Sequence, residues 1–219
     1  MPNVSLCAQE NEVHYNKVET KLVVYYEIQD TSAPTTIFTN YDNSVKSIEV
    51  DGELLDSVVT TYQFNSVGQH IIKFEFNDPT TVGNNAPLFY ILTTVKRVVI
   101  PNTFTSIGHN AFNGCSSLTN ITIGNSVTSI GQSAFAQCNS LISVTIGSGV
   151  TSIGDGAFYN SSSLTSITVE ALIPPKLEGG GGAFNNTNNC PIYVPSESVE
   201  AYKQETSWGQ YPSRIQAIQ

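Results

Sequence analysis

The four residues Thr-Ser-Ile-Gly recur three times at a fixed interval, and this repetition restricts the possible folds more than any other feature. The copies begin at Thr105, Thr128 and Thr151, so each lies 23 residues after the one before it. A unit this short cannot bury its apolar side alone, but stacked copies place like residues over like residues and share one core. The repeat therefore predicts a solenoid in which each 23-residue unit forms one coil.

The apolar positions of the unit recur with the same spacing as the motif. The columns are Ile107, Ile130 and Ile153; Ala111, Ala134 and Ala157; Phe112, Phe135 and Phe158; Leu118, Leu141 and Leu164; Ile121, Val144 and Ile167; Ile123, Ile146 and Val169; and Phe104, Val127, Val150 and Ile173. We expect these columns to form the core, with Phe135 packed between its two neighbours. The motif glycine should sit where the backbone needs a positive φ or a close approach.

Each coil contains a segment with strand-like alternation. In Ser117–Ile123 three apolar residues alternate with polar ones, which predicts a short strand that pairs in parallel with its copies. The polar residues should form rows on the outer face. This candidate ligand face consists of Asn120, Thr122, Ser143, Thr145, Ser166 and Thr168. The face could bind a protein or a glycan, or it could be only the soluble surface that any solenoid presents to water.

Two of the four cysteines, Cys115 and Cys138, share a repeat column with Ser161. The parallel strand spacing of about 4.8 Å would permit a disulfide between neighbouring coils. Buried cysteine columns more often act as small apolar residues, so we expect both thiols to be buried and reduced. Four cysteines without a CxxC pair predict neither a disulfide scaffold nor a zinc knuckle.

Imperfect copies extend the repeat in both directions. Thr80–Pro101 reads as a degenerate coil with about two extra residues, and Ala171–Pro195 keeps the Ala-Phe pair after a three-residue insertion that includes Gly179–Gly182. Residues 80–194 should therefore form about five coils. Residues 195–219 should close the open end with a short helix, N-capped by Ser196, followed by large apolar residues.

The N-terminal part has no copy elsewhere in the chain. Residues 17–79 contain five β-like segments and turn signals at Asp51-Gly52 and Val67-Gly68. They predict a small antiparallel sheet or sandwich packed on the first coil. Residues 1–16 are polar and should be flexible. The expected fold is mostly β throughout.

Charge and hydropathy restrict the function. Only 12% of the residues are charged, the net charge is −9, and Asp155 is the only charged residue between Val98 and Val169. This acidic balance without a basic stripe argues against nucleic-acid binding. No apolar run is long enough for a membrane span, and the stretch MPNVSLCAQE lacks the pattern of a signal peptide, so we expect neither.

Residues able to do chemistry are sparse. The histidines His14, His70 and His109 are scattered; His109 shares a variable repeat position with Gln132 and Asp155 and should be solvated. Asp155 has no acid–base partner nearby in the sequence, and the four glycines lack the lysine of a phosphate-binding loop. We therefore predict no catalytic, cofactor or metal site.

The segments SIGxxAFxxC at Ser106–Cys115 and Ser129–Cys138, together with SLTNITI and the terminal segment Ile192–Ile215, resemble the BspA-like leucine-rich repeat family of bacteria. The resemblance covers about residues 80–219. It implies a leucine-rich-repeat solenoid from a protein that is exposed at the cell surface or secreted, and that is linked to adhesion. Ligands differ between members, so none is transferred. Residues 17–79 resemble, less specifically, the Ig-like or hairpin region that precedes such repeats.

Three classes of function remain. A non-enzymatic binding or adhesion module fits the repeat and the lack of a catalytic set. A structural or scaffolding domain that associates with its own kind, or caps a larger assembly, is the alternative. An enzyme ranks last, because it would need a pocket that holds at least two coupled titratable groups.

Overall fold

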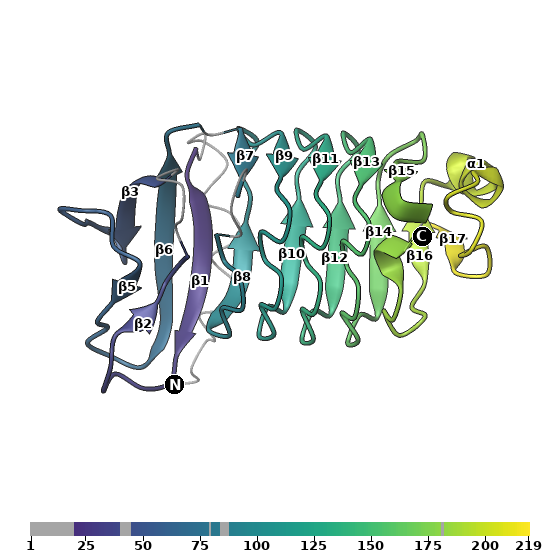
Figure 1. The fold of residues 1–219 in the computed structure, drawn as a ribbon. Helices are drawn as coiled ribbons and strands as arrows, with labels where there is room; N and C mark the ends of the chain where they lie inside the picture. The colour runs from purple at the N-terminus through teal and green to yellow at the C-terminus, as the bar shows by residue number, and fades with distance from the viewer. Residues whose placement is uncertain (1–19, 40–44, 79, 84–87, 181) are drawn as a thin grey trace, which may run out of the picture.

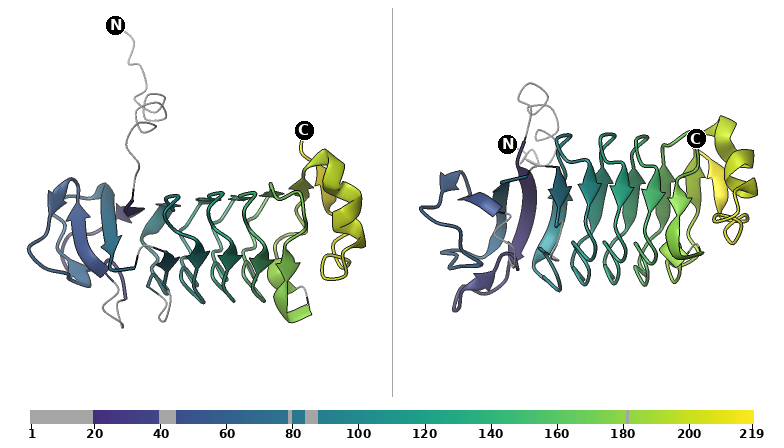
Figure 2. Two further views of the ribbon diagram at one scale, coloured as in Figure 1. Left: turned by 90° about the horizontal axis from the view of Figure 1, so that it is seen from above. Right: turned by 45° about the horizontal axis from the view of Figure 1, so that its top comes forward.

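The computed structural model describes residues 20–39, 45–78, 80–83, 88–180 and 182–219. The predicted flexible segment 1–16 lies outside these residues. The described chain is an elongated stack of β coils, with antiparallel strands at the N-terminal end and a small helical cap at the C-terminal end (Figures 1 and 2). The prediction of a mostly β fold is confirmed.

One long sheet runs through the whole described molecule. Its ten strands follow the order β17-β16-β14-β12-β10-β8-β1-β6-β3-β4. The strands are β1 (Leu22–Ile28), β3 (Val45–Val50), β4 (Glu53–Leu54), β6 (Gly68–Phe76), β8 (Val95–Val99), β10 (Asn120–Ile123), β12 (Ser143–Ile146), β14 (Ser166–Val169), β16 (Ile192–Val194) and β17 (Ile215–Ala217). From β8 to β17 every pairing is parallel, and Ile121, Val144 and Ile167 lie side by side, as predicted.

A second sheet lies on the other side of the coils and consists of two-residue strands. Its order is β15-β13-β11-β9-β7, with parallel pairing throughout. These strands are β7 (Thr81–Val82), β9 (Ser106–Ile107), β11 (Ser129–Ile130), β13 (Ser152–Ile153) and β15 (Lys176–Leu177). After each short strand the chain turns tightly, with Asn110, Ser133 and Gly156 at positive φ, before it reaches the next long strand. The Thr-Ser-Ile-Gly motif thus encodes the short strand and the start of this turn.

A column of aromatic rings fills the space between the two sheets. Phe89, Phe112, Phe135, Phe158 and Phe184 stack with centroid separations of 5.0 to 5.5 Å and nearly parallel planes. Phe135 lies between Phe112 and Phe158, as predicted. At the ends of the column, Phe74 of β6 packs edge-on against Phe89, and Trp208 of the cap packs against Phe184. The aromatic column therefore connects the N-terminal strands, the repeats and the cap.

The cysteine column has a hydrogen-bonding role. Cys115 and Cys138 are buried free thiols, and each Sγ donates to the carbonyl oxygen of a phenylalanine in the preceding coil, Phe89 and Phe112 respectively. Ser161 makes the same contact with Phe135 at 2.9 Å. Burial raises the pKa of the Cys115 thiol to about 12, and it raises the pKa of Cys138 as well. These thiols stay protonated at neutral pH and serve packing, because only a thiolate is a good nucleophile.

The glycine of the motif is required by close approach between coils. A Cβ added to Gly108, Gly131 or Gly154 would lie 2.0, 2.6 or 2.4 Å from backbone atoms of the preceding coil, which no side chain tolerates. None of the three has a positive φ. Of the two reasons expected for glycine, the structure thus shows the close approach.

The N-terminal strands are joined to the repeats within one sheet. β1 pairs antiparallel with β6 on one side and with β8 on the other. This differs from the expected separate sheet packed on the first coil. The physical reason is that β8 would otherwise expose an unpaired edge, which β1 covers. Asp51 and Gly52, both at positive φ, form the two-residue turn between β3 and β4, as the turn signal predicts. A separate short pair, β2 (Thr35–Thr36) and β5 (Thr61–Tyr62), lies beside this region.

The C-terminal cap differs from the sequence prediction at its helix start. A 3₁₀ turn, η4 (Ser196–Ser198), precedes the helix α1 (Val199–Gln204), so the prediction of Ser196 as N-cap is wrong. Ser198 occupies that position, and its hydroxyl donates to the carbonyl oxygen of Leu172 instead of capping the helix. Trp208 is fully buried, and its indole N–H donates to the carbonyl oxygen of Pro175. These contacts close the last coil, as expected of a cap.

The last coil also breaks one predicted apolar column. Ile173, aligned with Val150 by the 23-residue period, is 82% exposed. The cause is an extra residue in this coil, because Leu177 pairs with Ile153, 24 positions earlier. The insertion around the four glycines forms two further 3₁₀ turns, η2 (Glu178–Gly180) and η3 (Gly182–Phe184).

Candidate functional site

The six residues of the candidate ligand face lie together on the outer side of β10, β12 and β14. Strand pairing places Asn120, Ser143 and Ser166 in one row, and Thr122, Thr145 and Thr168 in a second row. The two residues of β10 are exposed, and the other four are half-buried by their neighbours in the rows. The apolar residues that alternate with them on the same strands are buried in the core. The sequence therefore correctly predicts which residues of these strands point outward and which point inward.

Hydrogen-bonding groups dominate this outer face. The Ser143 hydroxyl donates to Asn120 Oδ1 across 3.2 Å, which links two rungs of one row. The first row continues at β8 with Arg97, whose guanidinium lies 5.0 Å from the centre of the Tyr25 ring. The second row continues at β16 with Tyr193. The six polar residues are thus neutral, with the Arg97 guanidinium and the Tyr25 ring at one end of the rows and Tyr193 at the other.

A shallow hollow interrupts the outer face. It has a volume of about 110 Å³ and lies between β8 and β10, where Arg97–Val99 and Asn120–Thr122 line it. A hollow of this size is well below the range of small-molecule sites. The outer face around this hollow is therefore nearly flat.

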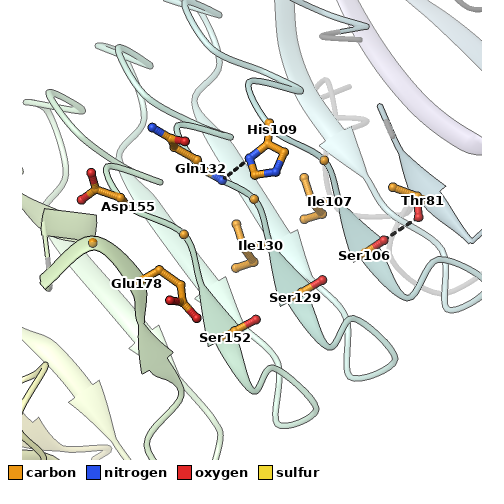
Figure 3. A pocket seen from close by; sticks show the side chains of 14 residues that line it. Thr81, Ser106, Ile107, His109, Ser129, Ile130, Gln132, Ser152, Asp155 and Glu178 are labelled. Atoms are coloured by element: carbon orange, nitrogen blue, oxygen red, sulfur yellow. Dashed lines mark hydrogen bonds between the residues drawn. The ribbon is translucent and has the colours of Figure 1, made fainter. Parts of the chain in front are cut away.

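A larger groove lies on the short-stranded sheet, on the other side of the coils (Figure 3). Its volume is about 630 Å³, which falls within the range of ligand sites. Its lining comprises Thr81, Ser106, Ile107, Gly108, His109, Ser129, Ile130, Gly131, Gln132, Ser152, Gly154, Asp155, Glu178 and Gly179. The groove runs from β7 to β15, so it crosses the coils along the stacking direction.

Two rows of side chains border the groove. The hydroxyl row consists of Thr81, Ser106, Ser129 and Ser152, which pair in register on neighbouring strands. The second row consists of the residues that follow the motif glycines, His109, Gln132 and Asp155. Between the rows lies the column of motif glycines, and the absence of side chains there forms the hollow. The side chains of Ile107 and Ile130 are buried beneath it.

Hydrogen bonds order the N-terminal half of the groove. The Ser106 and Thr81 hydroxyls lie 2.6 Å apart and share a hydrogen bond. The backbone N–H of Gln132 donates to His109 Nδ1 at 3.0 Å. A neutral His109 must therefore carry its proton on Nε2, which points its donor away from the backbone. The predicted solvation of His109 agrees with its exposure, but its place beside a groove was not foreseen.

Two carboxylates lie toward the β15 end of the groove. Asp155 packs against the glycine-rich insertion, where a Cβ on Gly179 would lie 2.4 Å from its Cγ. Glu178 forms an ion pair with Lys176 at 3.0 Å. The insertion thus needs glycine at this point to leave room for the Asp155 side chain, which gives a structural role to a segment that the sequence marked only as a loop.

A signal for the groove does exist in the sequence. The serine before each motif isoleucine and the polar residue after each motif glycine recur at the repeat period, as in Ser129 and Gln132. Recognising the groove also requires knowledge that the glycine between them lies against the previous coil. Periodicity alone does not show this packing.

His70 and Asp51 lie in the N-terminal strands, outside both surfaces. His70 of β6 is almost buried, and its Nδ1 lies 2.7 Å from Asp51 Oδ2 in the N-terminal strands. Among the residues that the structure describes, no cluster of three His, Cys, Asp or Glu side chains could hold a metal ion. Within the same residues, no helix has the length and hydropathy needed to cross a membrane.

Comparison with known proteins supports the repeat architecture. No curated protein matches the chain. Residues 80–206 match the family described as BspA type leucine rich repeat region, in six copies. Repeats of this kind are protein-interaction modules. Because the match covers more than half of the 219 residues, the chain belongs to the BspA-type leucine-rich repeat family.

Proposed function

We propose that the protein is a non-enzymatic binding module of the cell surface or of secreted proteins, and that a protein or glycan partner contacts the outer face of β10, β12 and β14. Family membership supports an interaction role. The observation that carries the proposal is the pair of in-register polar rows, Asn120-Ser143-Ser166 and Thr122-Thr145-Thr168, on the exposed side of a continuous sheet.

The physical character of this face suits recognition by shape and hydrogen bonds. Its hydroxyl and amide groups carry no charge, and a sheet ten strands wide holds them in fixed positions. A rigid surface loses little conformational entropy on binding. Because the six contact residues are neutral, they should add little to the salt dependence of binding.

The test is a triple substitution, Thr122→Lys, Thr145→Lys and Thr168→Lys. The purified protein is first screened against extracellular matrix proteins and glycan arrays, and the variant is then measured against the partner found. The substitutions open no cavity, so each should cost about 0.5 kcal/mol of stability or less. Three lysines across the face should abolish binding, because they introduce bulk and desolvation cost at the contact.

A matched control adds the same charge elsewhere. The triple substitution Asn139→Lys, Ser162→Lys and Ser163→Lys places three lysines at exposed turn positions. This control should bind like the unmodified protein. Binding that survives in the threonine variant, while its thermal unfolding stays normal, would remove the outer face from the proposal.

Self-association is the second candidate, and one observation favours it. Leu172 and Ile173 are neighbours that are 59% and 82% exposed beside the C-terminal cap. Exposed apolar pairs of this kind can contact a second copy or another repeat array. Sedimentation at increasing protein concentration separates the candidates, because only a self-associating protein would gain mass, and a Leu172→Ser, Ile173→Ser variant should then remain monomeric.

We further propose that the chain is organised as an Ig-like or hairpin region over residues 17–79, repeats over 80–194 and a cap over 195–219. The antiparallel pairing of β1, β3 and β6 supports the first unit, and the burial of Trp208 supports the last. Limited proteolysis tests the division, since a cut near residue 80 should release a repeat fragment that keeps its β signal in circular dichroism.

A further inference from the structure

We propose that the groove on the short-stranded sheet binds a linear, neutral, β-linked oligosaccharide, which lies along the stacking direction across the coils. This site is separate from the outer face, and the inference does not depend on the function proposed for that face. Three observations carry it: the lining repeats once per coil, the backbone N–H groups at the groove floor are already hydrogen-bonded, and carboxylates lie toward one end of the groove.

The lining of the groove repeats once per coil. Thr81, Ser106, Ser129 and Ser152 provide one hydroxyl per strand, and parallel strands lie about 4.8 Å apart. A ligand that satisfies several rungs must itself be a polymer with a repeat of similar length. An extended β-linked hexose chain has this property, because each sugar unit advances by nearly the same distance as one rung and carries several hydroxyl groups.

The opposite border of the groove repeats in the same way. His109, Gln132 and Asp155 lie on successive coils, and each carries a different hydrogen-bonding group. His109 offers its Nε2 donor, the Gln132 amide can donate and accept, and the Asp155 carboxylate accepts. Sugar hydroxyls donate and accept equally well, so one sugar chain can satisfy all three residues.

An extended peptide fits this groove less well. Peptides that add to a sheet use free backbone groups at an edge. Here the N–H groups of Gly108, Gly131 and Gly154 already donate to carbonyl oxygens of the preceding coil. An extended peptide also advances about 3.3 Å per residue, which is out of step with the rungs. The groove therefore lacks the backbone contacts that bind a strand.

The charges at the groove favour a neutral ligand. The carboxylates of Asp155 and Glu178 lie toward one end and would repel phosphate, sulfate or uronic acid groups. The nearby cation, Lys176, already pairs with Glu178. The glycine column keeps the floor free of side chains, and its close contact with the preceding coil means that no substitution could narrow it without moving the backbone. A pyranose ring can lie with one face on such a floor.

The experiment uses the full chain labelled with ¹⁵N, titrated with cellohexaose, cellobiose and maltohexaose. Cellohexaose should shift the amide signals of residues 106–109, 129–132 and 152–155. Cellobiose reaches fewer rungs and should bind at least tenfold more weakly. Maltohexaose has the same composition but a coiled shape, and it should cause little change. Equal affinity for the dimer and the hexamer, or shifts confined to the outer face, would overturn the proposal.

Two variants in the same coil assign the site. Ser129→Ala combined with Gln132→Ala removes one hydrogen-bonding group from each border of the groove. Loss of two hydrogen bonds should weaken cellohexaose binding about tenfold. Asn139→Ala, at an exposed turn position outside both surfaces, is the control and should leave the affinity unchanged. Both variants should melt like the parent, so that a loss of affinity reports the groove.

The results also separate this inference from the function proposed for the outer face. Cellohexaose binding that survives the Ser129→Ala, Gln132→Ala change but is lost in the triple threonine variant would overturn the groove proposal and support the outer face. Binding of a basic extended peptide to the groove, without any response to cellohexaose, would also overturn the assignment of an oligosaccharide.

Discussion

The N-terminal strands and the repeats share one sheet, but they define strand register in different ways. In the antiparallel pairings of β1, β3 and β6 the facing residues follow no repeat, as in Val23 with Lys73. The register shifts between Val45 and Ser47 where β3 pairs with β6, and between Tyr25 and Tyr26 where β1 pairs with β8. In the repeats, like residues pair with like, as in Ile121 with Val144. Register depends on specific complementarity in the first region and on repetition in the second. A single sheet can therefore contain strands whose register is determined in two different ways.

The two regions also differ in their stabilising interactions. Glu49 in the N-terminal region contacts both Lys21 and Lys73, whereas Asp155 alone is charged between Val98 and Val169. The repeats depend on apolar columns, the phenylalanine stack and short hydrogen bonds between coils. The pairing of β1 with β8 and the contact between Phe74 and Phe89 connect the regions.

The largest effect is expected from Phe135→Ala in the middle of the aromatic column. The ring is fully buried and stacked on both sides, so its loss should cost about 3–5 kcal/mol in urea denaturation. In a repeat array each coil contacts only its neighbours. Amide exchange should therefore accelerate first in residues 112–158, while β1 and β6 keep their protection.

Phe135→Leu is the matched control for this prediction. It keeps an apolar side chain in the cavity and should cost about 1–3 kcal/mol. Equal acceleration of exchange in the N-terminal strands and in the repeats would show that both regions unfold together. The contrast between the two regions would then apply to register but not to stability.

A smaller effect should follow from replacing one glycine in each region. Gly131→Ala pushes a Cβ to 2.6 Å from the Gly108 carbonyl carbon and should cost about 1–3 kcal/mol through displacement of the coils. Gly52→Ala has open space around it but keeps a φ of 92°, and should cost about 1 kcal/mol.

Asparagine separates the two reasons for glycine. It tolerates positive φ, so Gly52→Asn should recover stability relative to Gly52→Ala. Gly131→Asn should be worse than Gly131→Ala, because the larger side chain meets the same backbone. Thermal melts of the four variants provide the comparison. Recovery at both positions would mean that the repeat glycine also serves a conformational need.

The same contrast explains what the sequence could predict. Columns such as Ile107, Ile130 and Ile153 were predictable because each copy confirms the others, and a periodic apolar pattern has few packing solutions. The exposure of Ile173 was missed because one added residue shifts the register without changing the composition. The pairing of β1 with β8 was missed because β1 has no copy, so its partner depends on long-range complementarity.

The two candidate sites differ in the same way in how far the sequence could predict them. The outer rows, including Thr122 and Thr145, follow from strand alternation alone, so their placement was predictable. The groove depends on how close two coils lie at Gly131, and that distance results from packing in three dimensions. Both rows of the groove can be identified in the sequence. The close contact between neighbouring coils at the motif glycines, which leaves the hollow between the rows, cannot.

Acid should destabilise the N-terminal region more than the repeats. Partial burial opposes ionisation of Glu49, but hydrogen bonds and charges from Lys21 and Lys73 outweigh it, and the pKa of Glu49 is lowered. A lowered folded pKa means that the contribution is complete above the unfolded value, near 4.5, and is lost as the pH falls through the folded value.

Glu49→Gln tests this difference. At neutral pH it should cost about 1 kcal/mol or less, because the pair lies near the surface. Below pH 4 the variant and the parent should approach equal stability, measured by urea denaturation. A Glu49→Gln variant that keeps the same pH dependence as the parent would show that other carboxylates, such as Glu75, dominate the acid response.

The smallest effect is expected from Cys138→Ser, which tests whether repetition in the second region conserves a hydrogen bond or a sulfur atom. Cys138 Sγ donates to the Phe112 carbonyl oxygen at 3.3 Å, and Ser161 makes the equivalent bond one coil later. A serine hydroxyl should take over this bond, so stability should change by about 0.5 kcal/mol or less. Cys138→Ala removes the Sγ donor, while the Phe112 carbonyl oxygen still accepts from the Cys115 N–H, and it should cost about 1 kcal/mol. If serine costs more than alanine in thermal melts, the column is selected for apolar packing of sulfur, and the bond made by Ser161 is specific to its own coil.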